Sequence, residues 1–369
     1  MNNIMKLPPE ETYKKELMAL IKNDKGPKPI NWKLSPKSVR AFILGLQEPL
    51  ELDGEKVYIK KKFYGDDALV ERCIVTLAGN RGLMLVGEPG TAKTMLSELL
   101  AAAISGRSTN TIQGTAGVTE DMIKYSWNYA LLLSKGPCKE ALVPSPLYEG
   151  MNDGIITRFE EITRCQQEIQ DALISIMSDK IMKIPELGIE GNVFAKSGFN
   201  VIGTANLRDK GVNELSSALK RRFNFETVFP IKDLSLEVEI IKKQAKDVLN
   251  SSGVDMEISE SASEILATTF HEIREGITKE GYRLDKTEAV MSTAEAVSVY
   301  VQSAMSSYYY EDGNITMDTL AQNIIGTIIK DNRDDITKLK KYFSTIVKDR
   351  SIREGGLWQE YYTARKWIR

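Results

Sequence analysis

Short apolar runs alternate with amphipathic stretches through the first two thirds of the chain. Four apolar runs bounded by polar residues or glycine predict strands, at 83–86, near 111–113, at 155–159 and at 200–206. Three stretches carry the apolar spacing of helices, at 93–104, 166–178 and 212–220. This alternation predicts an α/β fold, with a parallel sheet covered by helices on both faces.

The pattern differs before and after this region. Upstream, we expect a helix at 9–22, a helix from Ser35 to Leu46 and a strand and turn at 57–65, before a helix capped by Asp66. From about Ile231, strand runs end and amphipathic helices dominate. The expected domains are a helical and strand extension, an α/β core, an all-α domain and a basic aromatic extension, at 1–65, 66–230, 231–331 and 332–369.

Composition narrows the classes of protein that this chain can represent. The net charge of -2 over 369 residues disfavours wholesale nucleic-acid binding. No apolar run approaches the ~20 residues of a membrane span, and the N-terminal stretch lacks the apolar centre of a signal peptide. Three widely spaced cysteines fit a reducing compartment, and a single histidine excludes a histidine-built metal site. We therefore expect a cytoplasmic protein without membrane contact.

The loop GEPGTAKT follows the first predicted strand and opens a helix. Its glycines allow the backbone to turn around an anion, so that N–H groups and the helix N-terminus face phosphates. Lys93 is placed to bridge the β- and γ-phosphates, and Thr94 to coordinate Mg²⁺. Ala92 replaces the usual glycine, and we expect alanine to be acceptable at a helix start. The predicted ATP-binding residues are Gly87, Glu88, Pro89, Gly90, Thr91, Ala92, Lys93, Thr94 and Met95.

Two adjacent glutamates, Glu160 and Glu161, follow the strand at 155–159. In nucleotide hydrolases the first such acid holds Mg²⁺, usually through its water, and the second polarises the attacking water. Glu160 is thus the expected metal residue with Thr94, and Glu161 the expected base, although a solvated strand end is an alternative. Glu160 is one methylene longer than the usual aspartate, a displacement of about 1.5 Å. Arg158 is also unusual inside a buried parallel strand.

Two later positions complete the candidate catalytic set. Asn206 ends the run NVIGTAN and could orient the lytic water beside Glu161, or simply form a turn. Arg221 and Arg222 end a predicted helix, where positively charged side chains can simply interact favourably with the helix dipole. Their functional interpretation is an arginine finger that reaches the γ-phosphate on a neighbouring subunit. That interpretation requires a ring, or at least a dimer.

These motifs together resemble those of the AAA+ ATPases, and most closely the MoxR family, over about residues 66–310. GEPGTAKT is similar to the phosphate loop of that family, including its alanine before lysine. FEEITR resembles DEINR, which places Glu160 on the metal-binding aspartate and Glu161 on the catalytic glutamate. The resemblance implies a P-loop AAA+ core with a parallel sheet, followed by an all-α lid.

The remaining motifs extend the resemblance. TANL resembles the sensor-1 motif and places that role on Asn206. ALKRRF resembles ALLDRF, which favours Arg222 over Arg221 as the finger. The stretch 126–143 occupies the place of the family's insert, and 181–196 that of its hairpin. Such elements face the pore or a partner in related rings, whereas ordinary loops are the alternative.

The lid departs from the family pattern. Members usually show Ser-Pro-Arg at the start of a lid helix, where the arginine acts as sensor 2. Ala294 aligns with that arginine, and Arg283 or Lys286 are candidates to replace it.

The resemblance implies an ATPase that couples Mg²⁺-dependent ATP hydrolysis to chaperone-like remodelling or maturation of a protein client. It further implies a homo-oligomeric ring, expected as a hexamer, and a partner with a von Willebrand factor A domain. One alternative is an ATP-loaded scaffold or switch with weak hydrolysis, which Glu160 and Ala294 favour. Another is a nucleic-acid motor, suggested by the basic aromatic tail but opposed by the net charge and the lack of a helicase motif.

Overall fold

The computed structural model describes residues 4–206, 213–328 and 334–368. The chain divides into two compact units. The first comprises Met1–Glu88 and Ala92–Phe229, and the second comprises Pro89–Thr91 and Pro230–Arg369. The boundary expected between residues 331 and 332 lies outside the described residues. Each unit has hydrophobic core of its own.

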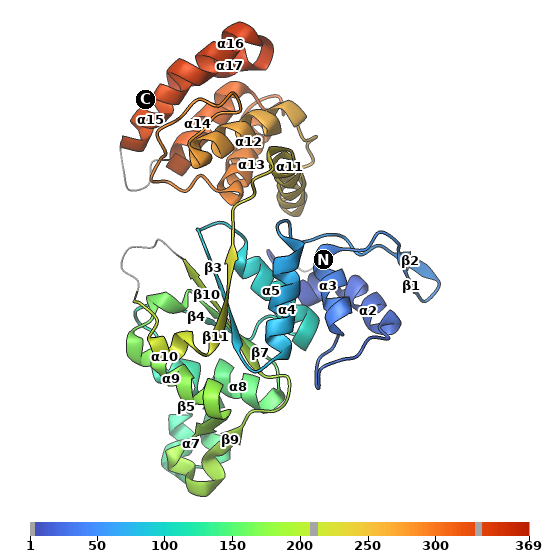
Figure 1. Ribbon diagram of the computed structural model, residues 1–369, viewed down its shortest axis with the longest axis vertical. Coiled ribbons are helices and arrows are strands. Elements are labelled where there is room, and N and C mark those ends of the chain that lie inside the picture. Colours follow the sequence, from blue (N-terminus) through green and yellow to red (C-terminus); the bar gives the residue numbers. More distant parts are fainter. Residues whose placement is uncertain (1–3, 207–212, 329–333, 369) are drawn as a thin grey trace. The chain divides into compact units, whose positions relative to one another are not determined.

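A five-stranded parallel sheet forms the centre of the first unit (Figure 1). In spatial order its strands are β11 (Phe223–Val228), β3 (Gly82–Gly87), β10 (Asn200–Asn206), β7 (Ile156–Glu160) and β4 (Thr111–Gln113). All neighbouring pairs are parallel, which confirms the predicted fold class. The sequence pattern did not predict β11. It is an edge strand whose residues are mostly only partly buried, so it lacks a continuous apolar run.

Helices cover both faces of this sheet. The face that carries Leu83 and Leu85 packs against α3 (Pro36–Leu44), α4 (Asp67–Ala78) and α5 (Lys93–Ser105). Neighbouring residues of β3, Met84 and Val86, join the core that contains α8 (Pro146–Asp153) and α9 (Gln167–Asp179). Successive strand residues point to opposite faces, so one apolar strand serves two cores.

The N-terminal residues pack on the same core as α5. The predicted helix at 9–22 is present as α1 (Pro9–Thr12) and α2 (Lys14–Asn23), which Tyr13 separates. A hairpin of β1 (Leu50–Leu52) and β2 (Glu55–Val57) follows. The expected strand at 57–65 was wrong beyond Val57. The chain there runs past the end of α3, and the backbone N–H of Lys62 donates to the Ile43 carbonyl at 2.9 Å.

Two small antiparallel pairs extend from the first unit. Beside α6 (Glu120–Ile123), β5 (Tyr125–Trp127) pairs with β6 (Leu142–Pro144), and α7 (Tyr129–Lys135) lies between them in sequence. The predicted hairpin at 181–196 is confirmed as β8 (Ile181–Lys183) paired with β9 (Asn192–Phe194). The 3₁₀ segment Pro185–Gly191 joins its strands.

The helix predicted at 212–220 is shorter than expected. Residue 212 lies outside the described residues, and α10 spans Ser217–Lys220. The side chain of Asn213 donates to the Cys165 carbonyl at 2.9 Å, and its backbone N–H donates to the Thr163 carbonyl at 2.7 Å. Residues 213–216 are therefore irregular, and Ser216 then caps the short helix.

The second unit is built from helices around one core, apart from an isolated bridge, over its described residues. The helices are α11 (Leu234–Ser251), α12 (Glu260–Glu275), α13 (Thr293–Tyr310), α14 (Met317–Ile328), α15 (Asp334–Tyr342), α16 (Lys348–Arg353) and α17 (Gly356–Thr363). A π-helical segment, Phe343–Val347, joins α15 to α16, and a 3₁₀ turn, Ala364–Trp367, follows α17. None of the helices among the described residues has the length and apolarity needed to cross a membrane.

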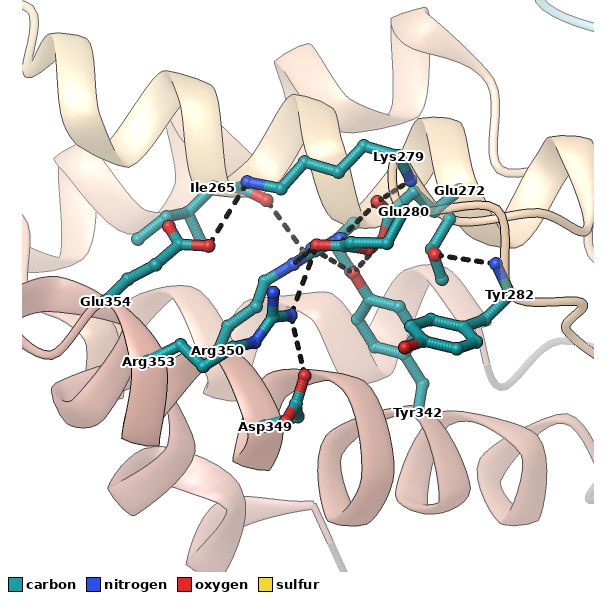
Figure 2. A network of polar contacts seen from close by, with 12 residues as sticks. Ile265, Glu272, Lys279, Glu280, Tyr282, Tyr342, Asp349, Arg350, Arg353 and Glu354 are labelled. Carbon is teal, nitrogen blue, oxygen red and sulfur yellow. Dashed lines mark hydrogen bonds and ion pairs between the residues drawn. The ribbon is translucent and has the colours of Figure 1, made fainter.

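A buried arginine anchors the C-terminal helices of this unit (Figure 2). The side chain of Arg350 donates to Glu272 at 2.5 Å and 3.1 Å, and to Glu280 at 2.9 Å and 2.8 Å. Tyr342 donates its hydroxyl to Glu272 at 2.7 Å, and the guanidinium lies 4.8 Å from the ring centre of Trp358. Several of the basic and aromatic tail residues thus form part of the folded core.

Candidate active site

The predicted phosphate loop joins the end of β3 to the start of α5. Gly90 has a φ of 76°, a left-handed conformation that glycine adopts without steric strain. The Lys93 ammonium donates to the carbonyls of Gly87 at 3.2 Å and Glu88 at 2.7 Å. The acceptors in these two bonds are neutral carbonyls, and the ammonium can exchange them for charged phosphate oxygens, which form stronger hydrogen bonds with it.

Ala92 does not adopt the helical conformation that we expected at this position. It precedes the helix with φ 66° and ψ 24°, in the left-handed region. A β-carbon there approaches the following carbonyl oxygen, which costs about 1–2 kcal/mol. The prediction that alanine is unstrained here was therefore wrong.

The carboxylate of Glu160 accepts four hydrogen bonds. Its Oε1 accepts from Arg158 at 2.6 Å and from the hydroxyl of Ser97 at 2.6 Å. Its Oε2 accepts from the hydroxyls of Thr94 at 2.9 Å and Thr204 at 2.8 Å. A carboxylate offers about four lone-pair sites, so these donors occupy all of them. Glu160 is buried, which excludes the solvated strand end as an alternative for this residue.

Arg158 and Glu160 lie on the same face of β7, two residues apart, against α5. Burial acts to raise the pKa of Glu160, but the positive charge of Arg158 and the three hydroxyl donors outweigh it and lower the pKa below its ordinary value. The carboxylate is therefore ionised at neutral pH. The sequence marked Arg158 as unusual, but it gave no sign of its contact with Ser97 or of the role of Thr204.

Glu161 and Asn206 lie in direct contact. The Asn206 amide donates to the two carboxylate oxygens of Glu161 at 3.0 Å and 3.2 Å. The register explains this contact: Asn206 pairs with Gly87, and Gly203 pairs with Phe159, so the ends of β3, β7 and β10 lie at one edge of the sheet. A predicted base and a predicted sensor thus meet beside the phosphate loop.

Two further features around Glu161 were not predicted. Arg164 donates its Nε to the Glu161 carboxylate at 2.7 Å. Glu161 has a φ of 54°, a strained conformation for a residue with a side chain. A β-carbon at Gly114 would lie 2.3 Å from the Glu161 carbonyl oxygen, so glycine is required after β4. Gly114 therefore permits the close approach of two strand ends.

Arg221 and Arg222 lie at the other end of the sheet from the phosphate loop. Phe223, the next residue, pairs with Gly82 at the start of β3, about 17 Å from Gly87 at ~3.3 Å per residue. Arg222 donates to the Ser178 hydroxyl at 2.9 Å and to the Ala218 carbonyl at 2.8 Å. Neither arginine is placed to reach a nucleotide at the phosphate loop of its own subunit.

The residues of the expected sensor-2 region lie in the helical unit. Ala294 is in the first turn of α13, and Arg283 and Lys286 are exposed between α12 and α13. Arg274 is a buried arginine nearby in sequence, but it donates to both oxygens of Glu237, at 3.0 Å and 2.7 Å. It is committed to holding α11 against α12.

The oxygen donors of this site fit Mg²⁺ held together with ATP. Thr94 supplies a hydroxyl oxygen, and Glu160 fixes that hydroxyl by accepting its hydrogen bond. Mg²⁺ takes only one or two protein groups together with phosphates and waters. Among the described residues, no group of three or more His, Cys, Asp or Glu could hold a metal ion by itself.

Comparison with known proteins agrees with this geometry. Residues 82–223 match the AAA domain (dynein-related subfamily), and residues 235–369 match the YehL-like AAA+ ATPase C-terminal domain. The YehL protein of Escherichia coli (strain K12) is 47% identical over 366 residues, which cover 99% of this chain and 98% of that protein. The chaperone MoxR1 of Mycobacterium tuberculosis is 28% identical over 204 residues, 52% of this chain and 49% of that protein.

A solved structure shares the fold. NtrX from Brucella abortus in complex with ADP matches with a TM-score of 0.50 and 13% identity, over 83% of this chain and 66% of that one. Together with the match to YehL along nearly the full length, these findings confirm the family that the motifs predicted. The chain belongs to the YehL-like AAA+ ATPases, and it is an ATPase of the MoxR-like type.

Proposed function

We propose that this ATPase hydrolyses ATP in a Mg²⁺-dependent reaction at the loop between β3 and α5. The contact between Glu161 and Asn206 at the sheet edge carries this proposal. Glu161 takes the role of the base that polarises the attacking water, and Asn206 orients that water molecule. Lys93 exchanges its loop carbonyls for the β- and γ-phosphate oxygens.

Thr94 and Glu160 are the residues that would hold the metal. The Thr94 hydroxyl donates a hydrogen bond to Glu160, which leaves a lone pair on the Thr94 oxygen available for Mg²⁺. When bound, Mg²⁺ neutralises charge on the phosphates.

The position of the arginines supports a homo-oligomeric ring, for which we propose a hexamer. Arg222, with Arg221 beside it, lies at the sheet end away from its own phosphate loop. A finger at this position can complete only a neighbouring subunit's site, where it would neutralise transition-state charge on the γ-phosphate.

For the biological role we propose chaperone-like remodelling or maturation of a protein client in the cytoplasm. The relative MoxR1 is named a chaperone, and this chain matches about half of it. The resemblance to the MoxR family adds a partner with a von Willebrand factor A domain. In this proposal ATP binding and hydrolysis shift the ring between two conformational states. The shift is limited by the difference in affinity of ATP for those two states.

Two observations bear on the alternatives. Glu160 has all its acceptor sites occupied, and Arg164 engages Glu161, which favours an ATP-loaded switch with weak hydrolysis as a second candidate function. The nucleic-acid motor loses support, because the tail residues Tyr342 and Tyr361 are buried and cannot stack on bases.

The test is Mg²⁺-dependent ATP turnover by the purified chain, with the Glu161→Gln variant beside it. We expect turnover to fall about 100- to 10,000-fold in the variant, the usual contribution of a general base, while ATP binding persists. Glu168→Gln, an exposed change on α9, is the matched control and should leave turnover unchanged. Tight binding without turnover in the unmodified chain would support the switch.

A further inference from the structure

Arg158 is buried in β7, two residues before the expected metal residue Glu160. It is an arginine inside a parallel strand, with a side chain 5% exposed. Its guanidinium donates three hydrogen bonds: Nη2 to Glu160 at 2.6 Å, Nε to the Ser97 hydroxyl at 2.9 Å and Nη1 to the Ser108 carbonyl at 2.8 Å. Nη2 also lies 3.8 Å from the carboxylate of Glu98 on α5. These partners belong to β7, α5 and the segment before β4.

Through these hydrogen bonds, Arg158 restricts the position of the expected metal residue, Glu160. Ser97 and Thr94 are on α5, the helix that the phosphate loop opens, and both hydroxyls donate to Glu160. Arg158 contacts Glu160 and Ser97 together, and so it fixes the carboxylate relative to the first turns of α5. A planar guanidinium can form these directed bonds together, whereas an ammonium cannot reproduce the fork.

The length of the Glu160 side chain explains why its carboxylate needs to be held in place. Glutamate extends about 1.5 Å further than aspartate, one C–C bond, whereas Mg²⁺ tolerates little departure from its preferred geometry. Arg158 and Ser97 both donate to Oε1, whereas Oε2 accepts from the hydroxyls of Thr94 and Thr204. The longer side chain is thereby drawn toward the arginine and held at a defined distance from Thr94.

We propose that Arg158 is a positioning residue for the metal site, which holds the Glu160 carboxylate so that it orients the Thr94 hydroxyl toward Mg²⁺. This inference rests on the proposed Mg²⁺·ATP site. It makes Arg158 and Glu160 a matched pair: each residue is useful at this site because the other is present.

The experiment measures binding of a fluorescent, non-hydrolysable ATP analogue by the full chain as MgCl₂ is titrated. For Arg158→Met we expect the half-saturating Mg²⁺ concentration to rise about tenfold, the lower end of the effect of losing a residue that orients a metal ligand. Arg158→Lys keeps the charge and is the safer variant to fold. We expect a rise of about threefold for it, because the fork is lost.

Controls separate positioning from stability. Ile43→Ala, a buried truncation in α3, should lower the unfolding temperature and leave the half-saturating Mg²⁺ concentration unchanged. The double variant Arg158→Met with Glu160→Asp should come closer to the unmodified chain than either single variant, which shows coupling within the pair.

The possible failures are distinguishable. If the unmodified chain binds the analogue without any dependence on Mg²⁺, the proposed metal site fails, and the role of Arg158 fails with it. If that dependence is present but Arg158→Met and Arg158→Lys match the unmodified chain, or bind Mg²⁺ more tightly, only the positioning role is overturned.

Discussion

Each unit of the molecule buries an arginine among carboxylates, but the surroundings differ. In the helical unit, Arg350 is bound on both sides by Glu272 and Glu280, and the tyrosine hydroxyl of Tyr342 completes the set. In the α/β unit, Arg158 donates to one carboxylate, Glu160, which also accepts from hydroxyl groups, while a second carboxylate, Glu98, lies 3.8 Å away. One cluster ties together helices, and the other ends at the phosphate loop.

The contrast shows how to distinguish a structural network from one that serves a site. Around Arg350, charged groups satisfy one another between α12, the segment that follows it, and α16. Glu160 accepts a hydrogen bond from Thr94, and a residue in a left-handed conformation lies close in sequence to each of them. These residues are Glu161, which follows Glu160, and Ala92, which lies two residues before Thr94. Strained backbone persists where the surroundings hold it, and it clusters at functional sites.

The largest effect that would test this comparison is expected at Arg350. The change Arg350→Met removes the cation that pairs with the buried carboxylate of Glu272, and breaking such a buried pair costs about 3–5 kcal/mol. Glu280 is only half-buried and keeps Arg353 at 3.5 Å, so it adds less to this loss. The unfolding temperature of the helical unit, measured by calorimetry, should therefore fall strongly. Arg365→Met, on an exposed arginine that stacks on Tyr362, should remain within about 0.5 kcal/mol. Equal losses in both variants would contradict a structural role for the cluster.

A smaller, pH-dependent effect is expected from the same cluster. Hydrogen bonds from Arg350 lower the pKa of Glu280 to about 2. A depressed carboxyl pKa stabilises the folded state above about pH 4.5, the ordinary value for glutamate, and that stability is lost as the pH falls from about 4.5 to 2.

The measurement is the unfolding temperature of the unmodified chain and of Glu280→Gln between pH 7 and pH 2.5. The unmodified chain should be the more stable at neutral pH, and the difference should shrink below pH 4.5. A difference that stays constant with pH would refute the linkage.

The smallest effect is expected at the strained phosphate loop. Ala92→Gly relieves about 1–2 kcal/mol of left-handed strain but adds about 0.4–1 kcal/mol of unfolded-state entropy. A slight net rise in the unfolding temperature should follow. Ala103→Gly, in the buried interior of α5, has no strain to relieve and should lose about 1 kcal/mol. If both variants lose stability equally, the strain at Ala92 is not significant.

The sequence by itself determined the central features of the fold. Strand and helix periods of the α/β region depend on neighbouring residues, so 83–86, 93–104, 166–178 and 200–206 could be predicted closely. The residues expected to meet ATP followed from the phosphate-loop, acidic and sensor motifs and from the family resemblance. The register of β3, β7 and β10 brings Glu160, Glu161 and Asn206 to one edge of the sheet.

Only the tertiary structure decided which partners those residues have. Ser97, Thr204 and Glu160 are far apart in the chain, and only the packing of α5 against β7 and β10 brings them together. The same holds for Arg350, which lies 78 residues from Glu272, so the sequence showed only a basic tail. Local patterns predict elements because they depend on adjacent residues, whereas the charge balance of a buried site depends on contacts that the chain forms only when it folds.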